Sequence, residues 1–205
     1  MMEHELLDQL NVSRETMKRL VVFSEVIRKW NPKINLVSKN SLELLWTRHI
    51  IDSIQVYRSA PSAKTWVDIG SGGGFPGLIV ALLAADEAPD LAVTLIESDQ
   101  RKSVFLRTAA RECGVKVKVI SDRIEKVEPQ HANIVSARAL ADLNVLLGYV
   151  HRHLGTNGTV LLPKGVTWKK EVEDACQNWH FEAEPISSLT EPDAVILKLQ
   201  GVARV

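Results

Sequence analysis

Cysteine is scarce in this chain, which contains only Cys113 and Cys176. The two are far apart, form no CxxC pair and have no histidine cluster near them. The sequence therefore predicts neither a disulfide framework nor a metal site. We expect both residues to be reduced thiols in a cytosolic protein, where they pack in the fold instead of acting as nucleophiles.

Long apolar runs are also lacking. No stretch reaches the ~18 apolar residues that a transmembrane helix needs, so we expect no membrane partner. The acidic N-terminus, Met1–Glu5, has no apolar segment of the kind found in secretory signals, which favours a cytoplasmic location. A length of 205 residues, 45% of them apolar and 24% charged, predicts one compact domain with a sizeable core, and we expect a monomer.

The chain has no net charge, because 25 Lys/Arg residues balance 25 Asp/Glu residues. A neutral chain argues against a nucleic-acid partner, but the charges are unevenly distributed. Residues 14–58 hold nine Lys/Arg against four Asp/Glu, a net of +5, and residues 171–205 hold two against seven, a net of −5. The chain can therefore present a basic face, although two solvated faces without a partner would give the same counts.

The N-terminal part is predicted to be helical. Residues 4–29 have helical periodicity, with a break near Asn11–Ser13. After this break, one mainly apolar face is formed by Met17, Leu20, Val21, Ser24 and Ile27. Asn31–Pro32 is expected to end the helix, because the residue before a proline avoids the helical region.

A further helix is predicted over residues 41–58, with Ser41 as its N-cap. About sixty residues of helix would then precede the first strand. We therefore expect a helical extension at residues 1–60, packed on a core at residues 61–205.

The most informative stretch begins at the predicted strand Thr65–Ile69. Five glycines follow within the eight residues Gly70–Gly77, and Gly77–Ala85 is predicted as an apolar helix with Pro76 set for its first turn. A strand, a glycine loop and a helix bring backbone N–H groups close to a ligand, because glycine has no Cβ to hold the ligand off.

Beyond this stretch the chain alternates strands and helices. Further strands are predicted at Ala92–Ile96, Lys116–Ile120, Asn133–Ser136, Thr159–Pro163, Phe181–Ile186 and Ala194–Leu199. Further helices are predicted at Asp99–Cys113, Leu140–Leu154 and Trp168–Trp179, with Gly155–Gly158 as a turn. This pattern predicts a Rossmann-like α/β fold: a seven-stranded, mostly parallel sheet with helices on both faces and an antiparallel hairpin at one edge.

Two interpretations of the glycine loop compete. Gly72-x-Gly74-x-x-Gly77, with Glu97 twenty residues further on, satisfies the dinucleotide-binding pattern. Asp68-x-Gly70-x-Gly72-x-Gly74, with the acid at the end of the strand, is instead the pattern of S-adenosylmethionine (SAM) methyltransferases. In these enzymes the acid and the loop amides face the amino-acid end of the cofactor. A turn that binds nothing is a third interpretation, but it would not need five glycines.

In open α/β sheets, ligands bind at the carboxyl ends of the strands, and this rule selects further candidates. Glu97 ends the second strand and can accept both ribose hydroxyls of an adenosine, or serve as a helix N-terminal acid. Ile124 follows the third strand and offers a surface for adenine. Arg138 follows the fourth strand, where it can orient an anion or form a surface ion pair.

Four motifs are specific to one family: Trp30-Asn31-x-x-Ile34-Asn35-Leu36, Arg48-His49-Ile50-x-Asp52-Ser53, the Asp68–Gly77 loop with its Phe75-Pro76-Gly77, and Val135-Ser136-Ala137-Arg138-Ala139. In their order and spacing, the chain resembles the bacterial small-subunit rRNA methyltransferases known as RsmG, also called the glucose-inhibited division protein B (GidB) family. The resemblance covers nearly the whole chain.

The resemblance implies a class I SAM-dependent methyltransferase fold and a cytoplasmic enzyme. Such an enzyme transfers methyl from SAM to N7 of a guanine in the decoding-region loop of 16S rRNA. Its partner would be 16S rRNA, either free or assembled in the small ribosomal subunit. It also implies cofactor contacts at Gly70, Phe75, Ile124, Glu125 and Arg138, to which the residue pattern adds Asp68, Gly72 and Glu97.

Guanine N7 carries a lone pair that can attack the sulfonium methyl directly, so no general base is predicted. Catalysis would be mainly positioning. Two alternatives remain: an NAD-dependent oxidoreductase on the same sheet, and a non-catalytic SAM-binding module associated with the ribosome.

Phosphate contacts are the largest part of most nucleic-acid interfaces. Candidates for them are Arg14, Lys18, Arg19, Arg28, Lys29, Lys33, Lys39, Arg48, Arg123, Arg138, Lys164, Lys169 and Lys170. His49, Trp30 and Trp46 are expected in the core rather than stacked on bases.

Overall fold

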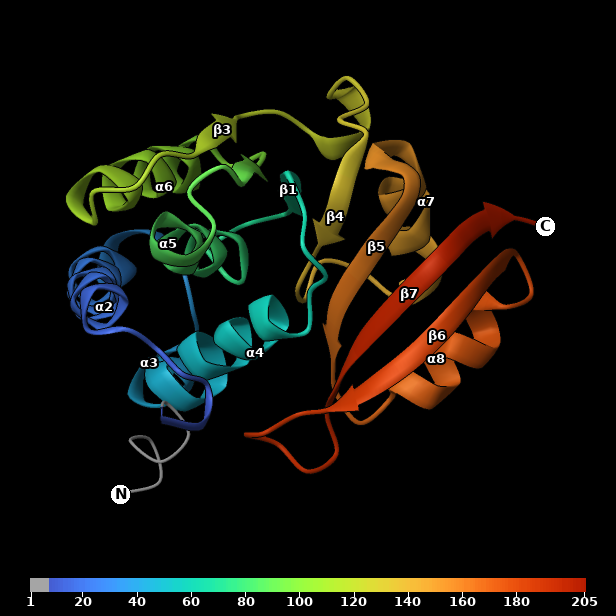
Figure 1. Cartoon of the computed structure of the whole chain (residues 1–205), viewed down its shortest axis with the longest axis horizontal. Coiled ribbons are helices and arrows are strands. Elements are labelled where there is room, and N and C mark those ends of the chain that lie inside the picture. The colour runs from blue at the N-terminus through green and yellow to red at the C-terminus, as the bar shows by residue number, and fades with distance from the viewer. Residues whose placement is uncertain (1–7) are drawn as a thin grey trace.

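The computed structural model describes residues 8–205. Its strands are β1 (Thr65–Ile69), β2 (Ala92–Ile96), β3 (Lys118–Ile120), β4 (Ala132–Ser136), β5 (Leu154–Lys164), β6 (Trp179–Ser187) and β7 (Val195–Arg204). They form one sheet in the order β3-β2-β1-β4-β5-β7-β6 (Figure 1). The first five strands pair in parallel, and β7 pairs antiparallel with both β5 and β6. The predicted seven-stranded α/β fold is confirmed.

The helical elements are α2 (Arg14–Ile34), α3 (Lys39–Glu43), the π-helical segment η1 (Trp46–Ile51), α4 (Asp52–Arg58), α5 (Gly77–Glu87), α6 (Gln100–Glu112), the 3-10 turn η2 (Ile124–Lys126), α7 (Leu143–His153) and α8 (Trp168–Ala175). None of the helices within residues 8–205 is long and apolar enough to cross a membrane.

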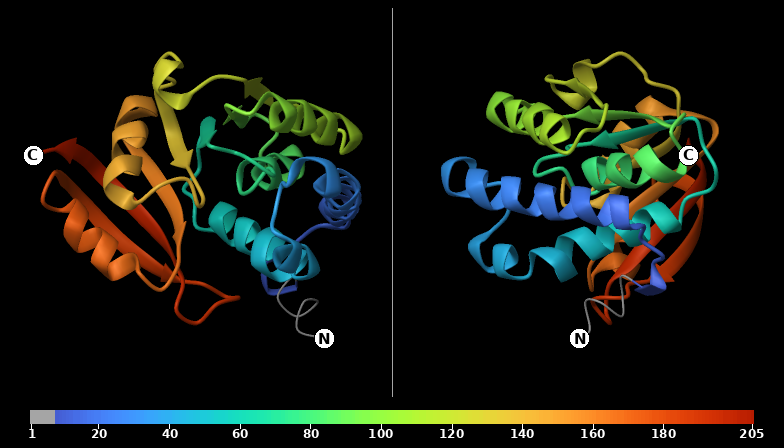
Figure 2. Two further views of the ribbon diagram at one scale, coloured as in Figure 1. Left: turned by 180° about the vertical axis from the view of Figure 1, so that it is seen from behind. Right: turned by 60° about the vertical axis from the view of Figure 1, so that its left-hand side comes forward.

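Two hydrophobic cores lie on the two faces of the sheet. Successive strand residues point to opposite faces, so Trp66 and Ile134 belong to one core while Val67 and Val135 belong to the other. Helices α2, α4, α5 and α6 supply the first core, and α7 and α8 supply the second (Figure 2). Helix α5 lies between α2 and the sheet, and its residues Gly77–Ala84 are all buried. This burial on every side explains why the helix has no polar residue before Asp86.

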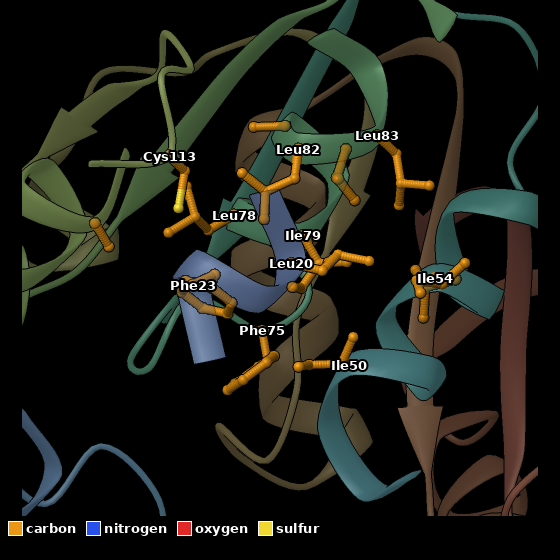
Figure 3. Packing of buried hydrophobic residues seen from close by; sticks show 14 of the residues in the cluster. Leu20, Phe23, Ile50, Ile54, Phe75, Leu78, Ile79, Leu82, Leu83 and Cys113 are labelled. Atoms are coloured by element: carbon orange, nitrogen blue, oxygen red, sulfur yellow. The ribbon is translucent and has the colours of Figure 1, made fainter. Parts of the chain in front are cut away.

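Helix α2 begins where the sequence predicts a break. The hydroxyl of Ser13 caps it by accepting a hydrogen bond from the N–H of Thr16. Its buried face is not quite the predicted one, because Val21 is 42% exposed whereas Phe23 is fully buried. Phe23 packs edge-on against Phe75, with the ring centroids 5.5 Å apart, and so joins α2 to the glycine loop (Figure 3). The predicted start of a first helix at residues 4–7 lies outside the described residues.

The prediction that Asn31–Pro32 ends α2 is wrong. The helix continues to Ile34, because a proline in the last turn removes only one of the final helical hydrogen bonds. Asn35 then takes a left-handed conformation and donates its N–H to the carbonyl of Asn31. The side chain of Asn31 accepts the N–H of Val37, which turns the chain back towards the sheet.

The single helix predicted over residues 41–58 is also wrong. Ser38, not Ser41, caps α3, and the chain leaves helical geometry at Leu44. The π-helical segment η1 and then α4 follow. At this break Leu44 is 49% exposed and Leu45 is fully buried. π-Helical segments are frequent at functional sites, and η1 contains His49.

Several boundaries differ from the predictions. Strand β3 is shorter, helix α7 starts at Leu143 after a turn that includes Ala139 at φ 50°, and α8 ends at Ala175. The turn predicted at Gly155–Gly158 is the irregular first part of β5, and β6 and β7 extend beyond the predicted hairpin. Cys113 is buried as expected, but Cys176 is exposed, so packing explains only the first of the two.

Candidate active site

The glycine loop is held against the end of β2 by its backbone. The N–H groups of Gly70 and Ser71 both donate to the carbonyl of Ile96, at 2.9 and 3.1 Å. Gly70 has φ +69°, and a Cβ there would lie 2.7 Å from the side chain of Leu140. The left-handed backbone therefore favours glycine at this position, and a larger residue would also have to displace the end of the Leu140 side chain.

The carboxylate of Glu97 fixes the other side of the loop. One oxygen accepts the N–H of Gly72 and the other accepts the N–H of Asp99, each at 2.8 Å. Asp99, rather than Glu97, caps α6 by accepting from Arg101 and Lys102. Each Glu97 oxygen keeps a further lone pair, so the structure leaves the predicted ribose contact available.

A cavity of about 440 Å³ opens in front of the loop, within the range of roughly 300–1,000 Å³ typical of small-molecule sites. It lies at the carboxyl ends of β1, β2, β3 and β4. Seven of the eight residues predicted to contact a cofactor line it: Gly70, Gly72, Phe75, Glu97, Ile124, Glu125 and Arg138.

Asp68 is the eighth, and the structure places it elsewhere. Its side chain is fully buried beneath the loop and does not line the cavity. The indole N–H of Trp66 donates to Ser136 at 2.8 Å, and the Ser136 hydroxyl donates to Oδ1 of Asp68 at 2.6 Å. Oδ2 accepts no hydrogen bond from the described residues and lies against Gly77. Burial raises the pKa of Asp68 to about 6.

This pKa predicts a pH-dependent stability. Between about pH 4 and 6 the folded chain binds more protons at Asp68 than the unfolded chain, so the contribution of Asp68 to the free energy of unfolding falls as the pH rises through this range and is then constant. The fall is at most about 3 kcal/mol, at about 1.4 kcal/mol per pKa unit. Asp68→Asn should remove it and stabilise the protein at neutral pH. Urea unfolding at a series of pH values measures this, with the exposed Asp90→Asn as control. Parallel curves for wild type and Asp68→Asn would contradict the prediction.

The family model GidB, described as rRNA small subunit methyltransferase G, matches residues 16–195. The chain belongs to this family. The Ribosomal RNA small subunit methyltransferase G of Ruegeria pomeroyi is 62% identical over 196 residues, which are 96% of each chain. That of Cereibacter sphaeroides (strain ATCC 17029) is 48% identical over 206 residues, covering both chains completely.

Solved structures agree on the fold. A TehB-like SAM-dependent methyltransferase from Corynebacterium glutamicum has a TM-score of 0.58 at 14% identity, over 80% of this chain and 94% of its own. A predicted O-methyltransferase from Agrobacterium tumefaciens has a TM-score of 0.56 at 17% identity, over 73% and 81%. Because both identities are below 25%, these structures show that the chain has the class I methyltransferase fold, and they show nothing about its function.

Two GidB motifs that lie far apart in the sequence meet at Arg138. Its guanidinium donates to the carbonyl of Arg48 at 3.1 Å and contacts Nδ1 of His49. It also lies over the ring of Phe75, 5.2 Å from the centroid, and His49 stacks on the same ring at 5.0 Å. Arg138 is therefore not a surface ion pair but the point where η1, the glycine loop and the end of β4 join.

Electrostatics fix the roles of these groups. Burial, with the charges of Arg138 and Arg48, lowers the pKa of His49 to about 3, so the ring is neutral and Nδ1 can accept from Arg138. Burial lowers the pKa of Arg138 to about 10, which leaves the guanidinium charged at neutral pH. His49 is a buried, hydrogen-bonded residue as predicted, and Trp30 and Trp46 are half-buried against the first core.

The sequence did not predict several residues that line the cavity in front of the glycine loop. These are Leu36, Val37, Ser71, Lys102, Leu140 and Tyr149. Leu36 belongs to a family motif and Ser71 to the glycine loop, so proximity in sequence could have found these two. Tyr149 comes from the middle of α7, and no pattern in the sequence places it beside the loop.

Proposed function

We propose that this chain is a SAM-dependent methyltransferase that methylates N7 of a guanine in 16S rRNA. Membership of a family described as rRNA small subunit methyltransferase G carries the proposal. The site supports it, because a glycine-rich loop, a carboxylate and an arginine converge on one cavity at the carboxyl ends of the strands. We also propose a monomeric, cytoplasmic enzyme.

The residues of the cavity fit SAM. Glu97 retains lone pairs for the ribose hydroxyls, Ile124 offers an apolar surface for adenine, and the open backbone at Gly72 can approach the amino-acid end. When bound, SAM supplies a sulfonium methyl group, which the N7 lone pair accepts as the bond to sulfur breaks and its electron pair stays on sulfur. No proton has to leave, so the chain needs to provide position and electrostatics rather than a base.

The start of α5 argues against a dinucleotide. A pyrophosphate binds to free N–H groups at a helix N-terminus. Here Pro76 has no N–H, the N–H of Leu78 donates to the carbonyl of Gly74, and Phe75, Pro76 and Gly77 are buried. This helix N-terminus is therefore buried, whereas the NAD-dependent oxidoreductase would need its N–H groups exposed to the ligand.

For the RNA, we propose the outer side of α2 and the turn after it as the phosphate-binding face (Figure 2). Exposed cations there are Arg14, Lys18, Arg28, Lys29, Lys33 and Lys39. Three other candidates are partly neutralised: Arg19 lies 3.8 Å from Asp86, Arg48 lies 3.9 Å from Glu191, and Lys164 pairs with Glu171 at 2.7 Å. Phosphate contacts of this kind orient the RNA without reading its sequence.

The test is transfer of labelled methyl from SAM to small ribosomal subunits, and to free 16S rRNA, from cells that lack this chain. We expect one 7-methylguanine in 16S rRNA, mapped by its chemical lability. Calorimetry with SAM and NAD should give binding of SAM alone. SAM binding without any transfer would favour the non-catalytic module, and NAD binding without SAM binding would favour the oxidoreductase.

A further inference from the structure

A second cavity, of about 640 Å³, lies on the other side of Arg138. It shares Arg138, Ala139 and Ala141 with the first cavity, so one short segment after β4 forms a wall of both. The end of β5 and the start of β7 form its floor, and η1 and α4 form the opposite side. It therefore adjoins the proposed cofactor site at the carboxyl ends of β4 and β5, where a second substrate would meet the methyl group.

Asp52, the first residue of α4, lines this second cavity with an incompletely satisfied carboxylate. Its Oδ1 accepts a hydrogen bond from the hydroxyl of Thr190. Its Oδ2 accepts none from residues 8–205 and is not one of the buried atoms without a partner, so it is accessible to solvent. Burial raises the pKa of Asp52, and Glu191 adds to the rise, although Thr190, Arg138 and Arg48 oppose it. Because Asp52 lines the cavity with one oxygen unbonded and its ionised form is poorly solvated, a cation or hydrogen-bond donor beside it would stabilise the carboxylate and be stabilised by it.

Other polar side chains in the same wall are already occupied. The amide of Gln55 donates to the carbonyl of Ser187 at 2.7 Å and accepts the N–H of Leu189 at 3.0 Å. Lys164 donates to Glu171 and to the carbonyl of Ala141. These bonds make the two side chains part of the framework, whereas Asp52 keeps an acceptor for a ligand.

We propose that this cavity receives the target guanine, swung out of the RNA, and that Asp52 accepts hydrogen bonds from its N1–H and 2-amino groups. The inference rests on the proposed function and adds the group that offsets the positive charge on the methylated base. Enzymes that act on a base take it out of the stack into a pocket that reads its edge. Guanine presents two adjacent donors on this edge, which match a carboxylate, whereas adenine presents an acceptor at N1 that a carboxylate repels.

Nucleotide binding tests the cavity without requiring turnover. GMP and 7-methylguanosine monophosphate, below neutral pH where the methylated base is cationic, are titrated into the full chain with S-adenosylhomocysteine present. We expect wild type to prefer the cationic nucleotide by about tenfold or more, as expected for an opposite charge within a few ångströms. Asp52→Asn should abolish the preference. Glu191→Gln, which removes a half-exposed carboxylate from the rim of the same cavity, should keep it.

Methyl transfer gives a second readout. Asp52→Asn should lower the single-turnover rate by about 10²-fold, as for loss of one group that stabilises developing charge, while its SAM affinity stays within about twofold of wild type. Ala194→Phe, which fills the cavity from the β6–β7 loop without a charge change, should weaken binding of both nucleotides and also keep SAM affinity.

Two results would overturn the inference: a charge preference that survives Asp52→Asn, or a loss of SAM affinity as large as the loss of rate. Wild type that transfers no methyl to rRNA would instead overturn the proposed function. In that case the nucleotide titrations still decide, by themselves, whether the cavity is a guanine site with Asp52 as its acceptor.

Discussion

Replacing Arg138 by lysine is expected to lower kcat/KM for methyl transfer to unmodified small subunits by about 10²–10³-fold, which corresponds to about 3–4 kcal/mol. The guanidinium uses separate N–H groups for the carbonyl of Arg48 and for Nδ1 of His49, and its plane covers Phe75. Lysine keeps the charge, but it cannot present a planar fork to both acceptors and stack on a ring. The wall between the two cavities would then lose its fixed shape.

Arg101→Lys is the matched control, because the Arg101 side chain is 71% exposed and, among residues 8–205, pairs only with Asp99. We expect this variant to keep wild-type activity, since exposed ion pairs contribute about 0–1 kcal/mol. Circular dichroism and SAM calorimetry separate a loss of function from a loss of fold. A folded Arg138→Lys enzyme with wild-type kcat/KM would show that the junction between η1, the loop and β4 does not orient the reacting groups.

The fold could be predicted from the sequence because its signals are local. Each central strand is a short apolar run followed by a turn residue, and the glycines after Ile69 fix where the first strand ends. Boundaries were wrong where a local preference was too weak to decide them. Pro32 stays inside α2 because a proline in the last turn removes only one helical hydrogen bond, and the N–H of Val37 then donates to the side chain of Asn31 just after the helix.

The site could be predicted only in part, for the same reason. The rule that ligands bind at strand ends selected Glu97, Ile124 and Arg138, because parallel strands bring their carboxyl ends to one edge. The glycine pattern added Gly70 and Gly72, and the family resemblance added Phe75 and Glu125. The rule failed for Asp68, whose carboxyl turns under the loop to accept from Ser136. Arg138 and His49, which contact each other, are 89 residues apart in the sequence. His49 lies in η1, after a break in the helix that helical periodicity did not reveal.

Two helical glycines should respond to alanine with opposite signs. At Gly77, a Cβ would lie 2.5 Å from both Cβ of Asp68 and Cδ2 of Leu95, in a core with no room to yield. Overpacking of this kind lowers the free energy of unfolding by about 1–3 kcal/mol, which outweighs the ~1 kcal/mol that alanine gains in a helix. At Gly148, on the exposed side of α7, the nearest atom would be 3.9 Å away, an ordinary contact with Trp179. Here alanine should stabilise the fold by about 0.5–1 kcal/mol.

The same pair tests how the loop is supported. Displacing Asp68 or Leu95 moves the ends of β1 and β2, on which Gly70 and Glu97 depend, so Gly77→Ala should also weaken SAM binding by about tenfold, equivalent to about 1.4 kcal/mol. Gly148→Ala should leave SAM binding unchanged, because Gly148 lies outside the cavity wall. Urea unfolding and calorimetry on both variants measure the two effects. If Gly77→Ala were as stable as wild type and bound SAM equally well, the close packing of α5 on Asp68 would not be what holds the loop in place.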